Sequence, residues 1–490
     1  MNPSAAKKGL RPWHCLVALA VLRVGIHLVL SHRGLLALSD DDYSRTVIAE
    51  RFASAPSLDP SGTSWLPLPF WVTGGAMMLF GRSLGVASIV TDVWAVGAGW
   101  LLFAGMRRLR IARGAALVGA VVATVVPPSA LLGSVNVPEL PTAALSAFAL
   151  LCVTHPHLRP MVPESPDWER SLWLAAVSVA AATLCRYEAW PIAGVIVAFA
   201  WIRRVPLATR IGTTALSLVG PFAWMLHNRA AHGDAMHFVH RVSSYGAALG
   251  APHGARQAAS YLGAAVTGCP SLLVPLVLVA VAAFRAKPTA LLRWLPALSG
   301  VGALLAFLVV GALVGGAPTH HPERTVLLLW ILGSAALVDL GQNLVGPDSL
   351  RRHKGLLRLG EIAVVALLAF DMHRQLDGTG VDRRSEISAG RALRALVAPD
   401  QRVIVATDDY GYFAVIAAFG RPLDCAVDRT HDPRAARAQS SLSSPEAMID
   451  RITAERAAWL VAPASSALPA ALMKRELVEG SLAVYRVRAP

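Results

Sequence analysis

The sequence predicts a polytopic α-helical membrane protein that ends in a small α/β domain. Of its 490 residues, 54% are hydrophobic and only 16% are charged, whereas soluble domains are about one quarter charged. Apolar runs of about 20 residues, long enough to cross a bilayer core, recur along most of the chain. After residue 375 such runs stop, and shorter helix-like and strand-like patterns alternate.

The apolar runs predict about eleven transmembrane helices in a domain that covers residues 1–375. Their expected ranges are 13–31, 86–106, 113–133, 138–154, 171–185, 187–202, 209–227, 269–284, 293–316, 325–345 and 359–371. With this number of spans, the basic clusters between them all fall on the cytoplasmic side, as the positive-inside bias requires. The first run follows Lys7, Lys8 and Arg11 without a small-residue cleavage site after it. We therefore expect a retained first span and a cytoplasmic N-terminus.

The first outer loop, residues 32–85, contains an apolar segment that we do not count as a span. This segment, WLPLPFWVTGGAMMLFG from Trp65 to Gly81, holds two prolines and a pair of glycines, which make a poor straight helix. Counting it as a span would also reverse the side of every later basic cluster. We expect it to lie at the membrane interface, anchored by Trp65 and Trp71.

Residues 376–490 are expected to form a soluble extracytoplasmic α/β domain. QRVIVAT, AAWLVAP and SLAVYRVR have the apolar, β-branched character of short buried strands. SEISAGRALRALVA has helical spacing after a Ser385 cap, and DYGYFAVIAAFG reads as a helix that Gly420 ends. The number of predicted spans places this domain outside the cytoplasm.

Charge and cysteine content exclude other classes of protein. The net charge of +14 comes from short clusters between spans rather than from a continuous basic stripe, so no nucleic-acid partner is expected. The five cysteines are scattered, which predicts neither a disulfide framework nor a metal cluster. The expected location is the inner membrane of a bacterium.

Three adjacent carboxylates, Asp40, Asp41 and Asp42, follow directly after the first span. One acid is enough to cap the helix TVIAERF, and adjacent acids raise one another's pKa unless a cation or a substrate is near. The alternatives are a solvated loop cap and a general base that takes a proton from an acceptor hydroxyl. A third possibility is a divalent cation, Mg or Mn, held by Asp40 and Asp42.

The acidic pair, Tyr43 and the following Ile48-Ala49 resemble the first outer loop of GT-C membrane glycosyltransferases. Protein O-mannosyltransferases and the lipid A aminoarabinose transferase belong to this superfamily. LPLPFWVTGGAMMLFG is similar to their Pro-containing juxtamembrane segment, which ends in Phe-Gly. The resemblance implies a GT-C fold and a sugar donor linked to polyprenyl phosphate. The acidic pair of the family can correspond to Asp40-Asp41 or to Asp41-Asp42. Asp41 belongs to both pairs and is the predicted base, with Tyr43 as a substrate contact. Asp42 makes the usual pair a triple, which leaves the choice among the three acids open.

HHPER, His320 to Arg324, opens the tenth expected span. Taken by itself, this stretch reads as an interface anchor in which Pro322 starts a helix and Glu323 lies in the first turn. Several GT-C subfamilies carry a similar His/Glu/Arg cluster at this place. The resemblance implies that Arg324, helped by His321 and His320, holds the carrier phosphate, and that Glu323 contacts substrate.

Two further polar stretches lie at expected outer span ends. In CRYEAWP, Arg186 can pair with Glu188 to close a tight turn. Bacterial members of the superfamily carry a similar Arg-Tyr-acid stretch, and this resemblance implies instead that Arg186 makes a second phosphate or sugar contact, with Tyr187 and Glu188 touching substrate. In NVPELP, Glu139 either contacts the acceptor or the sugar, or is a first-turn acid without a chemical role.

These observations favour an inverting glycosyltransferase, a hexosyl or pentosyl transferase that uses a polyprenyl-phosphate sugar. The acceptor hydroxyl, on a glycan, a lipid or a protein, is not fixed by the sequence. A transporter or lipid flippase would carry ionisable groups near mid-span and an inverted repeat, and Asp92 is the main residue of that kind. A non-catalytic assembly protein with the same fold is the remaining alternative. The C-terminal domain would cap the site or bind the acceptor.

Overall fold

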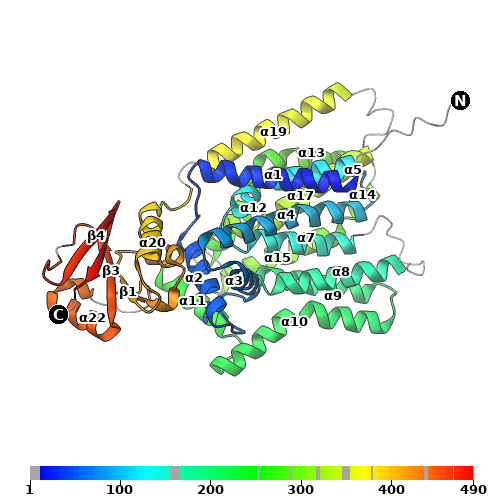
Figure 1. The fold of residues 1–490 in the computed structure, drawn as a ribbon. Coiled ribbons are helices and arrows are strands. Elements are labelled where there is room, and N and C mark those ends of the chain that lie inside the picture. Colours follow the sequence, from blue (N-terminus) through cyan, green and yellow to red (C-terminus); the bar gives the residue numbers. More distant parts are fainter. Residues whose placement is uncertain are drawn as a thin grey trace.

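A long bundle of helices carries a small sheet domain at one end (Figure 1). The computed structural model describes residues 11–154, 166–250, 254–286, 288–315, 321–344, 354–376, 379–434, 440–466 and 468–488. The bundle helices are α1 (Pro12–His32), α4 (Leu84–Arg108), α5 (Arg113–Val125), α7 (Glu139–Val153), α8 (Pro166–Thr183), α9 (Trp190–Ile202), α10 (Leu207–His232), α13 (Pro270–Ala286), α15 (Leu295–Leu313), α17 (Leu327–Leu344) and α19 (Lys354–Leu376). We call the end that carries the sheet domain the domain end, and the opposite end the far end.

Each of the eleven expected spans falls on a bundle helix, but eleven crossings are not confirmed. Within the described residues, four helices are long and apolar enough to cross a membrane: α1, α4, α15 and α17. A fifth crossing results if α12 (Ala255–Thr267) and α13, which meet at 76°, are taken as one bent span. Several others are short, such as α5 and α9 with 13 residues each, which is roughly 20 Å against a core of about 30 Å.

The expected span 113–133 is broken in two. α5 ends at Val125 and the short α6 (Pro127–Leu132) begins after Val126, whose backbone is extended. Pro127 has no N–H to continue the helix, and proline disfavours helical geometry in the residue before it. A predicted straight span therefore becomes two pieces, and the chain after α6 reaches the domain end at Glu139.

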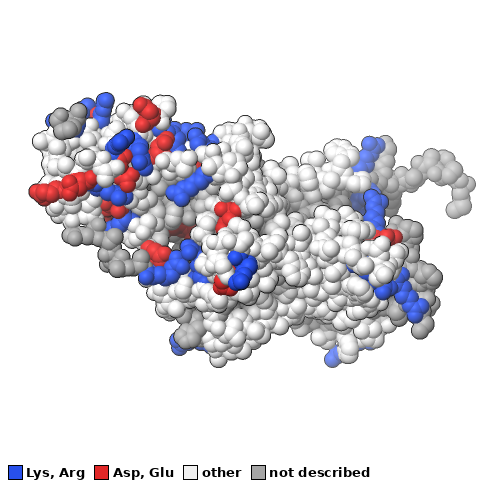
Figure 2. Space-filling model, turned by 90° about the horizontal axis from the view of Figure 1, so that it is seen from below, with Lys and Arg blue, Asp and Glu red and all other residues white. Residues whose placement is uncertain are grey.

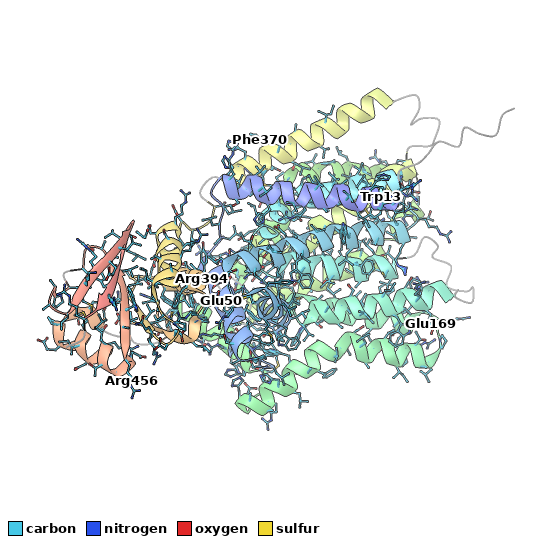
Figure 3. All side chains as sticks on the ribbon, viewed as in Figure 1. Trp13, Glu50, Glu169, Phe370, Arg394 and Arg456 are labelled. Atoms are coloured by element: carbon cyan, nitrogen blue, oxygen red, sulfur yellow. The ribbon has the colours of Figure 1, made fainter. Side chains whose placement is uncertain are left out.

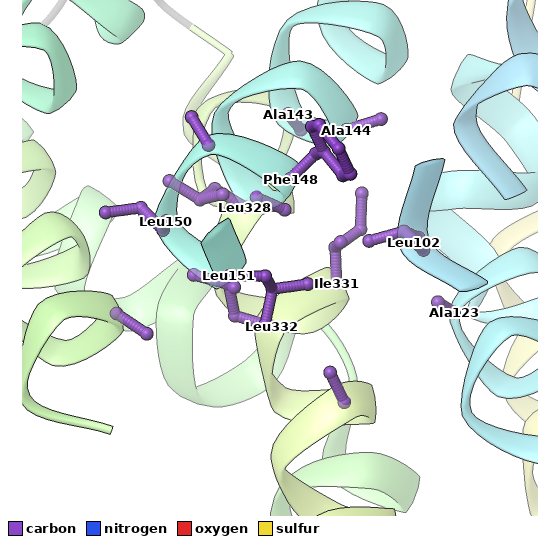
Figure 4. Close-up of a cluster of buried hydrophobic side chains, with 14 of the residues drawn as sticks. Leu102, Ala123, Ala143, Ala144, Phe148, Leu150, Leu151, Leu328, Ile331 and Leu332 are labelled. Carbon is purple, nitrogen blue, oxygen red and sulfur yellow. The ribbon is translucent and has the colours of Figure 1, made fainter. Parts of the chain in front are cut away.

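The centre of the bundle is α7, whose residues are almost all buried. Figure 4 shows Ala143, Ala144 and Phe148 of this helix packed against Leu102 of α4 and Ile331 of α17. Small residues such as Ala143, Ala144 and Ala147 let neighbouring helices approach closely, which favours association in a lipid environment. Because α7 is fixed on all sides, Glu139 at its N-terminus is held at the domain end.

Short helices cover the domain end of the bundle. They are α2 (Asp40–Ser54), α3 (Leu68–Phe80), η1 (Tyr187–Ala189), α11 (His237–Ala248), α12 and α16 (Pro322–Thr325), while α14 (Pro288–Leu292) lies at the far end. α3 lies in the segment that we did not count as a span. Figure 1 shows it nearly end-on, across the direction of α1 and α4.

The C-terminal domain contains a five-stranded mixed sheet in the order β2-β1-β3-β5-β4. β1 pairs in parallel with β2 and β3, whereas β5 pairs antiparallel with β3 and β4. The strands are β1 (Arg402–Val405), β2 (Cys425–Val427), β3 (Ala457–Pro463), β4 (Met473–Glu479) and β5 (Leu482–Val487). The helices are α20 (Arg384–Leu396), α21 (Tyr412–Phe419), η2 (Pro422–Asp424), η3 (Ser441–Ser443) and α22 (Pro445–Glu455).

Alternate residues of β1 face opposite sides of this sheet, as the period of a strand requires. Val403 and Val405 pack with α20 and α21 on one side, and Ile404 packs with Met448 of α22 on the other. Helices therefore cover both faces. The predicted Ser385 cap is wrong by two positions, because α20 begins at Arg384 and Arg383 is its N-cap.

The C-terminal domain shares a hydrophobic core with α2. Tyr43 and Val47 of α2 lie in the same buried cluster as Leu393 and Phe419 of the sheet domain. Figure 3 places Glu50 of α2 beside Arg394 of α20 at this junction, and Trp13 and Glu169 toward the far end. The acidic helix is thus packed directly against the C-terminal domain.

Charged side chains are concentrated at the two ends of the molecule. Figure 2 shows Lys, Arg, Asp and Glu over the C-terminal domain and a group of Lys and Arg at the far end, with a mostly uncharged zone between them. Arg107 and Arg108 end α4 at the far end, and Arg113 begins α5 there. An apolar zone between two charged ends is what a bilayer core requires.

Candidate active site

A cavity of about 790 Å³ lies at the domain end, between the bundle, α11 and the C-terminal domain. Eight of the predicted site residues line it: Asp40, Asp41, Glu139, Arg186, Tyr187, Glu188, His321 and Arg324. These residues come from four separate parts of the sequence. Asp42, Tyr43 and Glu323 do not line it, and His320 lies outside the described residues.

The three adjacent aspartates have three different environments. Asp40 is held by Arg383, whose Nε and Nη2 each lie 2.9 Å from one carboxylate oxygen. Asp41 is exposed in the cavity, and no hydrogen bond or ion pair of its side chain is found within the described part of the chain. Asp42 is 3% exposed and accepts a hydrogen bond of 2.6 Å from the Leu38 N–H. Successive residues of a helix point about 100° apart, which separates the three carboxylates.

Burial decides the properties of Asp42 and Tyr43. Burial raises the pKa of Asp42 to about 7, against the Leu38 hydrogen bond and the charge of Arg324, which lower it. Burial also raises the pKa of Tyr43, whose ring lies in the core shared with the C-terminal domain. Both side chains therefore pack within the protein instead of facing the cavity.

Arg186 is clamped between two carboxylates. Its Nη1 lies 2.8 Å from Glu139 Oε1, and its Nε and Nη2 lie 3.0 and 2.5 Å from Glu188 Oε1. Burial alone would lower the pKa of Arg186, but the two carboxylates outweigh it and raise the pKa above its ordinary value. The Arg186–Glu188 pairing that closes the turn is present, and Glu139 joins it. One guanidinium with two carboxylates leaves no net positive charge here for a phosphate.

Arg324 and His321 lie at the start of the helix that leads into α17. Arg324 is half-buried and lines the cavity, and within the described residues its guanidinium has no hydrogen-bond or ion-pair partner. His321 Nδ1 lies 3.5 Å from Glu323 Oε1, and the Glu323 side chain is mostly exposed, away from the cavity lining. Arg324 is therefore a cation available to an anion in the cavity.

Tyr187 acts as an anchor for the loop before α3. Its hydroxyl donates to the Ser64 carbonyl at 2.5 Å and accepts from Trp224 Nε1 at 3.0 Å. Its ring stacks on Phe238 with a centroid distance of 4.7 Å. These contacts tie the 63–66 segment, which forms part of the cavity wall, to α10 and α11.

Several lining residues were not predicted from the sequence. Arg45 lies on α2 four residues after Asp41, and its guanidinium stacks over Trp65 at 4.1 Å. Burial lowers the pKa of Arg45, while Glu139 and Asp41 raise it. The i, i+4 spacing from Asp41, which puts both side chains on one helix face, is the signal that could have found it. The other unpredicted lining residues include Arg241, Tyr245, Tyr410, Tyr412, His431 and Arg434.

The contacts of the aspartates do not fit the expected Mg or Mn site. Asp40 is bound to Arg383, and Asp42 is turned into the protein away from it. Among the residues that the structure describes, no group of three or more His, Cys, Asp or Glu side chains is placed to hold a metal ion.

The sequence matches no protein-family model and no curated protein. The structure, however, is similar to that of ArnT, the lipid A aminoarabinose transferase, from Cupriavidus metallidurans bound to undecaprenyl phosphate. That match has a TM-score of 0.64 at 14% identity and covers 97% of this chain and 98% of ArnT. The apo state of the same ArnT matches with a TM-score of 0.60 at 15% identity, over 96% of this chain and 98% of that one.

A second similar structure is the archaeal oligosaccharyltransferase AglB from Archaeoglobus fulgidus, in complex with an inhibitory peptide and a dolichol-phosphate. It matches with a TM-score of 0.53 at 12% identity, over 92% of this chain and 69% of AglB. Both are GT-C glycosyltransferases and both matches run over most of this chain. The chain therefore has the fold of the GT-C membrane glycosyltransferases, as the resemblance of its acidic loop predicted.

Proposed function

We propose that this chain is an inverting glycosyltransferase that moves a sugar from a polyprenyl-phosphate carrier to an acceptor hydroxyl at the outer face of the membrane. One observation carries the proposal: Asp41 and Arg324 line the same cavity, and neither has a partner among the described residues. The similar structures add support, since ArnT was solved with undecaprenyl phosphate and AglB with a dolichol-phosphate.

The proposed reaction is a single displacement at the anomeric carbon. The Asp41 carboxylate takes the proton of the acceptor hydroxyl as its oxygen forms a bond to the anomeric carbon. The bond from that carbon to the phosphate oxygen breaks, and polyprenyl phosphate leaves with the electron pair. Because attack and departure occur on opposite faces, the configuration at the anomeric carbon inverts.

Arg324 would stabilise the charge that grows on the leaving phosphate. A guanidinium binds phosphate through paired N–H donors, and it has most effect where charge develops in the transition state. Arg45 lies on the face of α2 that bears Asp41 and adds a second cation to the cavity. Arg186 is assigned a different role, because its charge is matched by Glu139 and Glu188, which it holds in place at the cavity wall.

The transporter alternative has one observation in its favour. His27 of α1 and Asp92 of α4 lie within apolar helices with their Nδ1 and Oδ1 atoms 3.0 Å apart. Arg23 lies one turn away and donates to the Ala130 carbonyl and to Ser134 Oγ. These contacts also join α1 to α4 and to the C-terminal half of α6. The two functions differ in product, because only a transferase makes a covalent bond between sugar and acceptor.

The test is a transfer assay with purified protein and a panel of polyprenyl-phosphate sugars. Asp41→Asn should lower the rate by about 100-fold or more, as expected for loss of a general base. The matched control is Asp450→Asn, because Asp450 is exposed on α22 and does not line the cavity. Unchanged turnover in Asp41→Asn would remove the proposed base. If the wild type transfers no sugar but moves the carrier across vesicles, the transporter alternative holds instead.

A further inference from the structure

One wall of the cavity is not used by the proposed chemistry. It is formed by α11 and by two loops of the C-terminal domain, residues 407–413 and 429–434. We call it the domain wall and define it by six lining residues: Arg241, Tyr245, Tyr410, Tyr412, His431 and Arg434. It is separate from Arg324, which comes from the segment that leads into α17.

The domain wall presents aromatic rings that its own contacts hold in place. Tyr412 is buried and supports the half-buried His431 ring, with a centroid distance of 6.1 Å and an interplanar angle of 16°. The Tyr410 hydroxyl donates to the His431 carbonyl, which joins the two loops. Aromatic rings with a polar edge suit a ligand that has an apolar face and hydroxyl groups, such as a pyranose ring.

Among the charged residues of these elements that line the cavity, two arginines, Arg241 and Arg434, face one carboxylate, Asp432. Asp432 binds Arg434 in a bidentate pair, with distances of 2.9 Å to Nε and 2.7 Å to Nη2. The Arg434 guanidinium also lies 5.5 Å from the centroid of the Tyr245 ring. Arg241 faces the same space, and no hydrogen bond or ion pair of its side chain is found in the described ranges. Tyr245 lies four residues after Arg241 on α11, so Arg241 shares the helix face whose Tyr245 ring Arg434 contacts. Burial and the Arg434 cation lower the pKa of Arg241.

The domain wall and the proposed base, Asp41, line the same cavity. Burial and the Tyr410 hydroxyl raise the pKa of Tyr245, and the Asp41 carboxylate contributes to this rise. A ligand on this wall would therefore hold a hydroxyl group near Asp41, while the donor phosphate binds at Arg324.

We propose that the domain wall is the acceptor subsite, and that it takes a saccharide that bears a carboxylate or a phosphate. The inference rests on the proposed function and names the class of its acceptor. Rings pack against Tyr410 and His431, and the acidic group binds Arg241 beside Arg434. A peptide hydroxyl would use neither the stacked rings nor the surplus charge.

The test measures equilibrium binding to the full-length protein in detergent without any donor. The probes are maltotriose as a neutral saccharide, trigalacturonate as a carboxylate, glucose phosphate as a phosphate, and a serine-containing peptide. We expect one or both acidic saccharides to bind more tightly than maltotriose and the peptide. Arg241→Gln should weaken that binding about tenfold, as expected for a charge-assisted hydrogen bond. Comparing trigalacturonate with glucose phosphate identifies the acidic group.

The matched control is Arg256→Gln, since Arg256 is an exposed residue of α12 that does not line the cavity. It should leave saccharide binding unchanged. The inference is overturned if Arg241→Gln binds the acidic probes as the wild type does, or if no saccharide binds better than the peptide. Because the assay contains no donor, these outcomes are independent of the transfer assay. If the wild type transfers no sugar in the transfer assay, that result contradicts the proposed function and leaves the binding result unaffected.

Discussion

At the scale of single residues, the acidic triple shows how one turn of helix separates three identical side chains. Asp40 binds Arg383 of the C-terminal domain, Asp41 faces the cavity, and Asp42 is buried against Leu38. The like charges therefore do not share one environment. The first acid therefore joins α2 to the C-terminal domain, the second is the proposed base, and the third packs inside the protein.

Asp42 should make stability depend on pH. Its pKa is raised from 3.8 to about 7 in the folded protein, so the buried carboxyl favours the fold while it is protonated. Between these values the unfolded chain has released the proton and the folded chain has kept it, so stability falls as pH rises through this window. Asp42→Asn cannot ionise and keeps an oxygen for the Leu38 N–H. We expect its thermal unfolding in detergent to lose this pH dependence.

Asp450→Asn is the control for Asp42→Asn, because it removes an exposed carboxylate from α22. It should unfold with the pH dependence of the wild type. An equal loss of stability with rising pH in Asp42→Asn and in the wild type would show that Asp42 is not the titrating group.

Arg186 should be required for stability through the two carboxylates that it binds. Arg186→Met leaves Glu139 and Glu188 buried without their cation, which costs about 3–5 kcal/mol for a broken buried ion pair. Replacing all three, with Arg186→Met, Glu139→Gln and Glu188→Gln together, removes the uncompensated charge and should recover most of that loss. Denaturation midpoints of the two variants in detergent test this. A triple variant no more stable than Arg186→Met would contradict the charge argument.

Much of the candidate site could be predicted residue by residue, because polar groups at the ends of apolar runs stand out. Asp41, Glu139, Arg186 and Arg324 all belong to such stretches, and all line the cavity. The residues that were missed come mainly from the C-terminal domain, where polar and aromatic residues are ordinary. Nothing in the spacing of Tyr410 and His431 indicates that they line a cavity with α2, more than 350 residues earlier in the sequence.

At the scale of elements, α2 joins the membrane bundle to the C-terminal domain. Arg383 binds Asp40 of α2, and also Asp409 at 2.8 Å and Glu386 at 3.0 Å. Asp409 in turn accepts a hydrogen bond from the Gly411 N–H, just before α21. A Cβ added at Gly411 would lie 2.8 Å from Glu386 Oε1, so this ion-paired carboxylate would have to shift. One guanidinium thus links the acidic helix to a loop of the cavity wall.

Replacing Arg383 should therefore loosen the docking of the C-terminal domain. Arg383→Ala leaves three carboxylates without their shared cation, and the Arg383 side chain is only 13% exposed. We expect a clear drop in thermal stability and faster proteolytic cleavage between the bundle and the C-terminal domain. The neighbouring variant Arg384→Ala is the control, because Arg384 is largely exposed and pairs only weakly with Asp382. Equal stability of the two variants would contradict the docking role.

Helices and strands with a strong hydrophobic pattern were predicted well from the sequence. AAWLVAP is β3, and DYGYFAVIAAFG contains α21, which ends where Gly420 adopts a left-handed conformation with φ of 75°. β4 was not predicted, because it is an edge strand whose charged residues face solvent. The break at Val126 and the 76° bend between α12 and α13 were also missed, because hydropathy does not show where a helix axis changes direction.

At the scale of the whole molecule, the proposed function requires the cavity and the C-terminal domain to face away from the cytoplasm. Basic residues such as Arg108 and Arg113 lie at the far end, where the positive-inside bias predicts the cytoplasm. Asp400→Cys should then react with an impermeant thiol reagent in intact cells, whereas Arg204→Cys should react only after permeabilisation. Both positions are exposed, and Cys425, which is partly exposed, would first be replaced by serine. If the Asp400→Cys thiol is protected in intact cells, the C-terminal domain lies in the cytoplasm and the predicted topology is wrong.

The decisive experiment measures both sugar transfer and carrier binding by Asp41→Asn. We expect this variant to bind polyprenyl phosphate as tightly as the wild type, because Arg324 is unchanged, and its transfer rate to fall by about 100-fold or more. Transfer at the wild-type rate by a variant that binds the carrier normally would contradict the claim that Asp41 activates the acceptor in the cavity it shares with Arg324.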